Sequence, residues 1–294
     1  MATLAITGAL HSTATDVLDL HADVLPVELL PNKICHRAFL RLVMLAPTHP
    51  LQKLVYTHAK CYIRSHRSPL HELANVFDIN PQEVEVIAPP SFPPGHQLRF
   101  TTTIQNTAEE STARARSCHS ELVIYSDGSG LGGHAGAAAV MYKAGQNPKV
   151  LKLYIGTLEE HTTYEAEAAG LSLALHLLSV ERDTRSATIM LDNQSVIQSL
   201  RYCKSGTAKY LVSGLLSQFD SIFRQARQPD FKLDIAWVKG HMEIEGNEMV
   251  DKAAKEAAGG ESSEVSSLPS LLATIPLPVS ASASKQNYRA SLHG

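Results

Sequence analysis

Residues 122–133 read Leu-Val-Ile-Tyr-Ser-Asp-Gly-Ser-Gly-Leu-Gly-Gly, an apolar run that ends in a carboxylate and a glycine-rich stretch. The β-branched and aromatic residues predict a buried strand, and the glycines permit the positive φ angles of a turn. An ionised carboxylate at the edge of an apolar segment is costly unless it is solvated, paired or bound to a metal ion. Asp127 is therefore a candidate functional group, and an Asx-turn starting at Asp127 is the structural alternative.

Three further acidic residues occupy similar places. Glu167 falls in an early turn of a long helical pattern and points toward the interior. Asp192 ends a buried strand pattern, and Asp251 lies in the first two turns of a helix predicted over 247–258. If these side chains converge at one end of a sheet, they form a site for divalent cations, because hard cations prefer oxygen ligands.

Each of these three residues also has a purely structural interpretation. Glu167 could pair with a Lys or Arg inside the fold, and Asp192 could cap the helix that follows it. Asp251 could form an ion pair with Lys255 at i,i+4. Glu165 lies two residues from Glu167 on another face of the helix, and we predict that it is solvated.

The order strand, helix, strand, loop and helix resembles the ribonuclease H family. The resemblance rests on four motifs that occur in the family's order: Asp127-Gly128-Ser129, Ala166-Glu167, Asp192-Asn193-Gln194, and Trp237-Val238-Lys239-Gly240-His241 followed by Asn247 and Asp251. It covers roughly residues 120 to 259. It implies an α/β fold of the ribonuclease H-like three-layer type, with a mixed five-stranded sheet, preceded by a helical N-terminal segment.

The resemblance also implies an activity: cleavage of the RNA strand of an RNA/DNA hybrid, which leaves a 3′-hydroxyl and a 5′-phosphate. Two Mg²⁺ ions, or Mn²⁺ in their place, would lie about 3.5 to 4 Å apart. Asp127 would bridge both ions, Asp251 would complete the site that activates water, and Glu167 with Asp192 would hold the ion beside the leaving group. His241 would shuttle a proton or assist product release.

Residues that the resemblance places at the substrate are Gly128, Ser129, Thr162, Thr163, Gln194 and Asn247. Gln194 would read the minor groove of the hybrid, although an ordinary role in the first turn of a helix is the alternative. Family members specialised for RNA in hybrids often carry asparagines where this chain has Thr162 and Thr163, so the contacts to the hybrid differ here.

The charge of the matched region predicts weak binding of nucleic acid. Residues 121–258 hold 14 basic and 17 acidic residues, and a basic, tryptophan-bearing helix found in some family members is absent from the sequence. Contacts from another part of the chain would then matter. The alternative function is a non-catalytic nucleic-acid-binding remnant of a retroelement. The Trp-Val-Lys-Gly-His motif argues against another nuclease of the same superfold.

The first part of the chain is predicted to be helical and basic. Helical patterns cover 22–45, 50–64 and 69–77, so residues 1–78 form a helical segment. Residues 29–71 contain seven Lys or Arg and no Asp or Glu. The basic residues repeat at helical spacing, so they form stripes that could contact phosphates or could be ordinary solvated faces.

The helical segment resembles the region that joins reverse transcriptase to ribonuclease H in non-LTR retrotransposon polyproteins. No polymerase motif is present, so the resemblance implies a detached C-terminal portion. Residues 79–120, rich in Pro, Thr and Ser, are predicted as a linker that could hold one short strand, ahead of a domain over 121–259. Residues 260–294 are predicted as a disordered tail.

The composition favours an intracellular protein, in the nucleus or the cytoplasm. The net charge is −3, and no run approaches the roughly 20 apolar residues of a membrane span. The four cysteines are far apart without a CxxC pair, which argues against a zinc site and predicts free thiols in a reducing compartment. The sequence does not indicate an oligomeric state.

Overall fold

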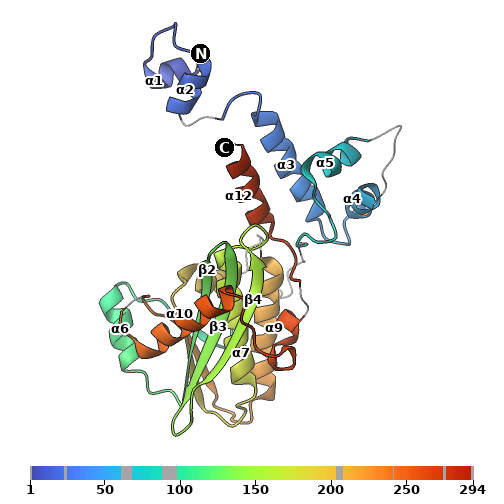
Figure 1. Cartoon of the computed structure of the whole chain (residues 1–294). Helices are drawn as coiled ribbons and strands as arrows, with labels where there is room; N and C mark the ends of the chain where they lie inside the picture. The colour runs from blue at the N-terminus through green and yellow to red at the C-terminus, as the bar shows by residue number, and fades with distance from the viewer. Residues whose placement is uncertain are drawn as a thin grey trace. The chain divides into compact units, whose positions relative to one another are not determined.

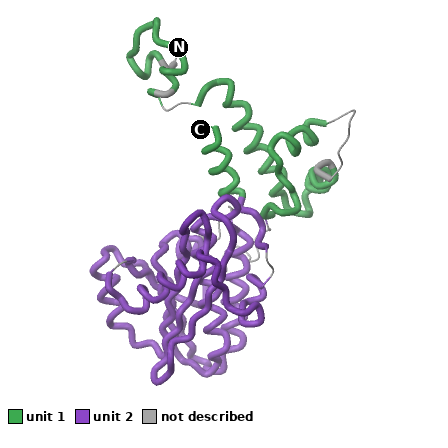
Figure 2. Tube along the Cα trace, viewed as in Figure 1, with its two compact units in different colours: residues 1–86, 281–294 green, residues 87–280 purple. Residues whose placement is uncertain are grey.

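The chain forms two compact units. The computed structural model describes residues 2–22, 25–60, 68–87, 98–202, 208–240, 242–273 and 276–292. Residues 1–86 and 281–294 make the first unit, here called the helical unit, and residues 87–280 make the second, the sheet unit (Figure 2). None of the helices in the described ranges is long and apolar enough to cross a membrane.

The sheet unit is built on one mixed sheet of six strands in the order β1-β6-β5-β2-β3-β4. The strands are β1 (Thr101–Thr103), β2 (Leu122–Leu131), β3 (His134–Lys143), β4 (Lys149–Thr157), β5 (Ser186–Leu191) and β6 (Lys232–Trp237). β1, β6, β5 and β2 pair in parallel, whereas β2, β3 and β4 pair antiparallel. The turn between β2 and β3 uses Gly132 and Gly133, at φ +60° and +83°.

Helices cover both faces of this sheet (Figure 1). The helices of the sheet unit are α6 (Ala108–Arg116), α7 (Thr163–Ser179), α8 (Gln194–Tyr202), α9 (Lys209–Gln225), α10 (Glu245–Ala258) and α11 (Ser270–Ala273), with a short 3-10 turn η1 (Val265–Ser267). Leu122 and Ile124 of β2 belong to the core shared with α7, α8 and α9. Tyr125 belongs to the core shared with α6 and α10 on the opposite face. The alternation of side chains along β2 thus supplies both cores, and the predicted three-layer α/β fold is confirmed.

The sheet has six strands rather than the predicted five. The additional strand β1 lies within the segment predicted as a linker, and it pairs in parallel with β6. Asp234 on β6 holds it, because its Oδ1 accepts hydrogen bonds from the hydroxyls of Thr101 and Thr103 at 2.6 and 2.9 Å. Its Oδ2 pairs with Arg114 of α6 at 2.6 Å. The linker was predicted to hold at most one short strand, and β1 is that strand; its place in the sheet depends on Asp234, 131 and 133 residues away in sequence.

The end of the chain also differs from the predicted disordered tail. Ser262 and Ser263 hydrogen-bond to the free edge of β4, where Ser263 Oγ accepts from the Lys152 amide at 3.0 Å. Leu268, Leu272 and Leu277 are buried. The serines satisfy edge-strand backbone groups, and the spaced leucines bury apolar area, so this segment is ordered despite its polar composition.

The helical unit holds six helices in its described ranges. They are α1 (Ala2–Thr7), α2 (Thr15–His21), α3 (Leu30–Val43), α4 (Pro50–Lys60), α5 (Pro69–Phe77) and α12 (Ala281–Ser291). α3 begins at Leu30 instead of residue 22, because Pro31 lies in its first turn, where a missing N–H costs nothing. The C-terminal helix α12 packs on α3 through the His36 and Tyr288 rings, stacked at 4.1 Å between centroids.

We expect the contact between α12 and α3 to weaken as the pH falls. Burial, and then the positive charge of Lys285, lowers the pKa of His36 from 6.5 to about 4. The unfolded state therefore binds more protons between these two values, so this contribution to stability is present above about 6.5 and is lost toward about 4. Hydrogen exchange of the α12 amides at about pH 7 and about pH 5, corrected for intrinsic rates, should show lower protection at the acidic pH.

The matched control is His36→Phe, which keeps a ring against Tyr288 but cannot titrate. Its α12 amides should be protected equally at both pH values. An equal loss of protection in both proteins would contradict a role for His36.

Candidate metal centre

The register of two strands brings Asp127 and Asp192 together. β2 and β5 pair in parallel as far as Ser126 and Leu191, so the next residue on each strand is an aspartate. β5 ends there, whereas β2 continues and pairs Asp127 with Ala138 of β3. The Asx-turn considered for Asp127 is therefore absent, because the chain stays extended through this residue.

Close packing of α7 on β2 brings in Glu167. A Cβ at Gly128 would lie 2.2 Å from the Glu167 amide nitrogen, and a Cβ at Gly170 would lie 2.6 Å from the Asp127 carbonyl oxygen. The helix thus lies nearer to the strand than any side chain at these two positions would allow. Glu167 is 8% exposed. Its carboxylate is held inside the fold, as predicted.

The three carboxylates form one cluster. Asp127, Glu167 and Asp192 each offer one oxygen, and these oxygens all lie within 4.8 Å of one another. The Gly128 amide donates to Asp127 Oδ1 at 2.9 Å. The Asn193 side chain and the Gly128 amide also donate to Glu167, whereas its Oε2 is buried without a hydrogen-bond partner among the described residues.

The cluster disfavours its own ionisation. Burial, followed by the charges of Asp192 and Asp251, raises the pKa of Asp127 from 3.8 to about 7. Burial, followed by the charges of Asp127 and Asp192, raises the pKa of Glu167 from 4.5 to about 9. Both shifts have the sign expected when carboxylates share a buried site, and the charge of Lys255 offsets only part of the shift of Asp127. A cation at the cluster would supply further positive charge.

The fourth predicted ligand, Asp251, stands apart from the three. Its Oδ2 forms an ion pair with Lys255 at 2.7 Å, so the alternative considered from the sequence is realised. Its charge nevertheless contributes to the raised pKa of Asp127, which places it close to the cluster. Because Asp251 and Lys255 are 23% and 46% exposed, their ion pair is of the weak, solvent-screened kind.

Several groups position Asp192. The Trp237 indole Nε1 donates to its carbonyl oxygen at 2.9 Å. Asn193, not Asp192, caps α8, since Asn193 Oδ1 accepts from the amides of Ser195 and Val196 at 2.9 and 3.3 Å. Asn193 thus makes the capping contact that was considered for Asp192, and one carboxylate oxygen of Asp192 lies in the cluster.

Residues predicted to contact substrate occupy varied environments. The Thr162 hydroxyl belongs to the capping box of α7, where it accepts from the Glu165 amide at 3.3 Å. Ser129 and Asn247 are 9% and 7% exposed, Thr163 is exposed, and Gln194 is the first residue of α8. His241 lies outside the described residues, so its proposed role stays a prediction.

Residues 119–259 match the RNase H family. No curated protein matches the chain. We call residues 119–259 the RNase H region after the family they match; they contain the three clustered carboxylates and Asp251, and their bounds agree with the resemblance drawn from the four motifs.

Solved structures of RNase H proteins align with about half of the chain. An RNase H1 from the archaeon Halobacterium salinarum is 19% identical, with a TM-score of 0.36, and covers 48% of this chain and 98% of its own. The N-terminal RNase H domain of a Mycobacterium tuberculosis protein, solved as a fusion with maltose binding protein, is 23% identical, with a TM-score of 0.36, and covers 47% and 98%. LC11-RNase H1 in complex with an RNA/DNA hybrid is 19% identical, with a TM-score of 0.37, and covers 47% and 97%.

The residues of the RNase H region fit a divalent cation. Three carboxylates supply hard oxygen donors at short mutual distances. Glu167 Oε2 is buried and unpartnered among the described residues, which is costly unless a cation or a proton occupies the site. The chemistry of the donors suits Mg²⁺ or Mn²⁺ rather than a soft metal.

Sequence reasoning gave no role to two residues that shape this site. Asn193 both caps α8 and donates to Glu167. Gly240 lies against Asp192, since a Cβ there would be 2.8 Å from Asp192 Oδ2. The signal for Asn193 was in the sequence, because Asn before a helix is a favoured N-cap. The close approach of Gly240 to Asp192 has no signal in the local sequence, because the two residues are far apart in the chain.

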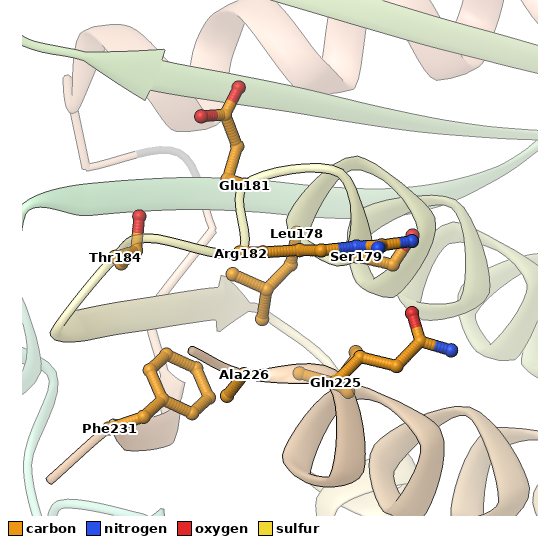
Figure 3. A pocket seen from close by; sticks show the side chains of 9 residues that line it. Leu178, Ser179, Glu181, Arg182, Thr184, Gln225, Ala226 and Phe231 are labelled. Atoms are coloured by element: carbon orange, nitrogen blue, oxygen red, sulfur yellow. The ribbon is translucent and has the colours of Figure 1, made fainter. Parts of the chain in front are cut away.

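The RNase H region also has a small hollow at the far end of α7 (Figure 3). It is lined by residues such as Leu178 and Phe231 and holds about 10 Å³, room for about one water molecule. At 1.5 Å per residue, Leu178 is about 16 Å along α7 from Glu167. This hollow is therefore separate from the carboxylates and too small for a ligand.

We expect Gly240→Ala to weaken metal binding without unfolding the chain. The new Cβ would displace the Asp192 carboxylate, which can move because it is the end of a side chain. Mutation of a residue that contacts a metal ligand without binding the metal itself typically lowers metal affinity or activity by about 10- to 100-fold. A Mn²⁺ titration followed by calorimetry, with Asp192→Asn as reference, measures the effect. Unchanged affinity would show that Gly240 does not constrain Asp192.

Proposed function

We propose that the chain is a metal-dependent endonuclease that cleaves the RNA strand of RNA/DNA hybrids by two-metal-ion phosphodiester hydrolysis. The observation that carries the proposal is the convergence of Asp127, Glu167 and Asp192, three carboxylates within 4.8 Å, inside a region that matches the RNase H family. A buried cluster of like charges is costly to the fold, so a functional reason for keeping it is needed.

The proposed ligands are Asp127, Glu167 and Asp192, with Asp251 joining after it leaves Lys255. When bound, divalent ions would activate a water molecule and stabilise the leaving 3′-oxygen. We propose Asp127 as the shared ligand, which the charges of both Asp192 and Asp251 support because both raise its pKa. Asn193 and Gly128 would orient Glu167 by donating to it, and its Oε2, which has no hydrogen-bond partner among the described residues, would contact the ion.

The RNA strand would lie along the start of α7 and the glycine-rich half of β2. Thr163 is exposed there and borders Gly130, since a Cβ at Gly130 would lie 2.8 Å from Thr163 Cγ2. Its hydroxyl is suited to a 2′-OH or a phosphate oxygen. The Thr162 hydroxyl is committed to the helix cap, so we propose that Thr163 makes the stronger contact of the two.

A second candidate is a non-catalytic nucleic-acid-binding remnant of a retroelement with the same fold. The observation that favours it is the Asp251–Lys255 ion pair, which holds one predicted ligand away from the other three. The excess of acidic over basic residues in 121–258 also favours this candidate, because it predicts weak binding of a hybrid substrate.

One experiment separates the two candidates. A hybrid labelled on its RNA strand is incubated with the full chain and Mg²⁺, and then with EDTA. The nuclease proposal expects shortened RNA with Mg²⁺ and intact RNA with EDTA. Hybrid that is retarded in a native gel yet intact in Mg²⁺ would overturn that proposal in favour of the binding module.

We also propose a retroelement context and an intracellular location. The helical patterns that resemble a reverse transcriptase connection region support the first. Cys35 and Cys118 support the second, because both are free cysteines and a reducing compartment keeps thiols reduced.

A further inference from the structure

The helical unit carries a basic surface assembled from the two ends of the chain. α3 contributes one stripe at i,i+4 spacing, and α12 contributes two residues one helical turn apart. We call this surface the basic face, and it consists of Lys33, Arg37, Arg41, Lys285 and Arg289. The three arginines are exposed and the two lysines are half-buried.

Aromatic packing fixes α12 in the position that completes the basic face. The rings of His36 and Tyr288 stack at 4.1 Å, and Phe77 meets both edge-on at 5.2 and 5.3 Å. The Ala281 amide at the start of α12 donates to the buried Glu85 at 2.9 Å. Lys285 lies one turn before Tyr288, so the contact that docks α12 also sets this lysine near Arg37 and Arg41 of α3.

Acidic residues are scarce around the basic face in the described part of the chain, where Glu85 is the acidic neighbour of Lys285. Residues 29–71 contain no Asp or Glu. Among the described residues, no carboxylate forms an ion pair with Arg37 or Arg41. The pKa of Lys285 is lowered, first by burial and also by the charges of Arg37 and Arg41, although Glu85 opposes the shift. The cations of the two helices thus repel each other, and a bound polyanion would relieve that repulsion.

We propose that the basic face binds the phosphate backbone of a nucleic-acid duplex. Lys33 and Arg41 are about 12 Å apart along α3, at 1.5 Å per residue. A duplex presents about one phosphate charge per 1.7 Å of axis, so several phosphates span that distance. The guanidinium group of an arginine can donate two parallel hydrogen bonds to phosphate oxygens. The basic face therefore matches an extended polyanion better than a single phosphate group.

A duplex is favoured over an anionic membrane surface. The large apolar residues exposed on α3 are Leu30 and Ile34, at 42% and 57%, and neither is aromatic. Helices that lie in a membrane interface usually bury a broad apolar face with Trp or Phe. The RNase H region supplies little backbone affinity of its own, since residues 121–258 hold 17 acidic against 14 basic residues. A positive surface elsewhere in the chain provides the missing electrostatic contact.

The test measures binding without catalysis. The full chain in EDTA is titrated into a fluorescent hybrid duplex of arbitrary sequence, and anisotropy is followed at several salt concentrations. The variant Arg37→Gln/Arg41→Gln removes two exposed charges from the basic face. The matched control Arg116→Gln/Lys232→Gln removes two exposed charges from the sheet unit.

The proposal expects Arg37→Gln/Arg41→Gln to bind about 10- to 60-fold more weakly near 0.1 M salt. Its slope of log K against log salt should be shallower by about 1.8, because each lost phosphate contact removes about 0.9. The control should change both quantities much less. Circular dichroism establishes that the two variants remain helical.

Two results would overturn the proposal. One is an equal loss of affinity in both variants, which would make the effect one of net charge alone. The other is binding to phosphatidylserine vesicles that depends on Arg37 and Arg41 while duplex binding does not. Since no metal is present, a failure of cleavage leaves this measurement unaffected, and the inference does not rest on catalytic activity.

Discussion

Asp127→Asn is expected to abolish metal-dependent cleavage of a hybrid while leaving the fold at least as stable. Asp127 is one of the three clustered carboxylates, and the charges of Asp192 and Asp251 both raise its pKa. Asparagine keeps its shape but loses the charge that holds a cation. The loss of a shared ligand costs several kcal/mol of transition-state stabilisation, and about 4 kcal/mol is a factor of about 1,000 in rate.

The stability of the metal-free variant follows from the sign of the same pKa shift. The pKa of Asp127 is raised to about 7 in the folded chain. The folded state therefore binds more protons than the unfolded state between about 4 and about 7, and stability falls as the pH rises through that interval. Asparagine removes this penalty, so in EDTA near neutral pH its free energy of unfolding should equal or exceed that of the original chain.

Both quantities are measured on the same preparations, cleavage by gel with Mg²⁺ and stability by urea titration in EDTA. Glu159→Gln, an exposed acid ahead of α7, is the matched control and should leave cleavage unchanged. Residual activity within tenfold of the original would remove Asp127 from the metal site. A less stable metal-free Asp127→Asn would contradict the repulsion within the cluster.

Gly128→Ala is expected to prevent α7 from packing on β2. The added methyl would lie 2.2 Å from the Glu167 amide nitrogen and 2.4 Å from the Ala166 carbonyl carbon. Both are backbone atoms, so no rotamer change relieves the clash and the helix must move away from the strand. Overpacking usually costs about 1–3 kcal/mol, and a rigid backbone neighbour places this substitution at about 3 kcal/mol or above. That is a large share of a typical domain's stability.

Gly130→Ala is the matched control on the same strand. Its methyl would meet the side chains of Thr163 and Leu158, the nearest at 2.8 Å, and side chains can adjust. We expect a loss of about 1 kcal/mol or less in a urea titration. Equal losses in the two variants would show that the close approach of α7 to Gly128 does not hold the fold together.

The positions of the clustered acids were largely predictable from the sequence. Asp127 and Asp192 each follow an apolar strand pattern, and the structure sets those strands side by side in parallel. Glu167 follows from helical periodicity, since its position faces the core. These inferences depend on the periodicity of apolar residues within each segment, which can be read from the local sequence.

Other features depend on contacts between distant residues. Strand β1 has three residues, too few for a periodic signal, and exists because Asp234 binds its threonines. The prediction that Glu165 is solvated is wrong, because the residue is 0% exposed. Glu165 turns back to accept from the Thr162 amide at 2.8 Å in the capping box of α7. The Asp251–Lys255 pair was foreseen as an alternative, but spacing alone could not decide between a salt bridge and a ligand.

The central claim is that Asp127, Glu167 and Asp192 hold divalent cations. An anomalous difference map from crystals of the full chain grown with Mn²⁺ tests it most directly. The account predicts two peaks about 3.5 to 4 Å apart, bounded by these three carboxylates, with Asp251 turned from Lys255 toward one of them. A map without a peak among the three carboxylates at saturating Mn²⁺ would contradict it.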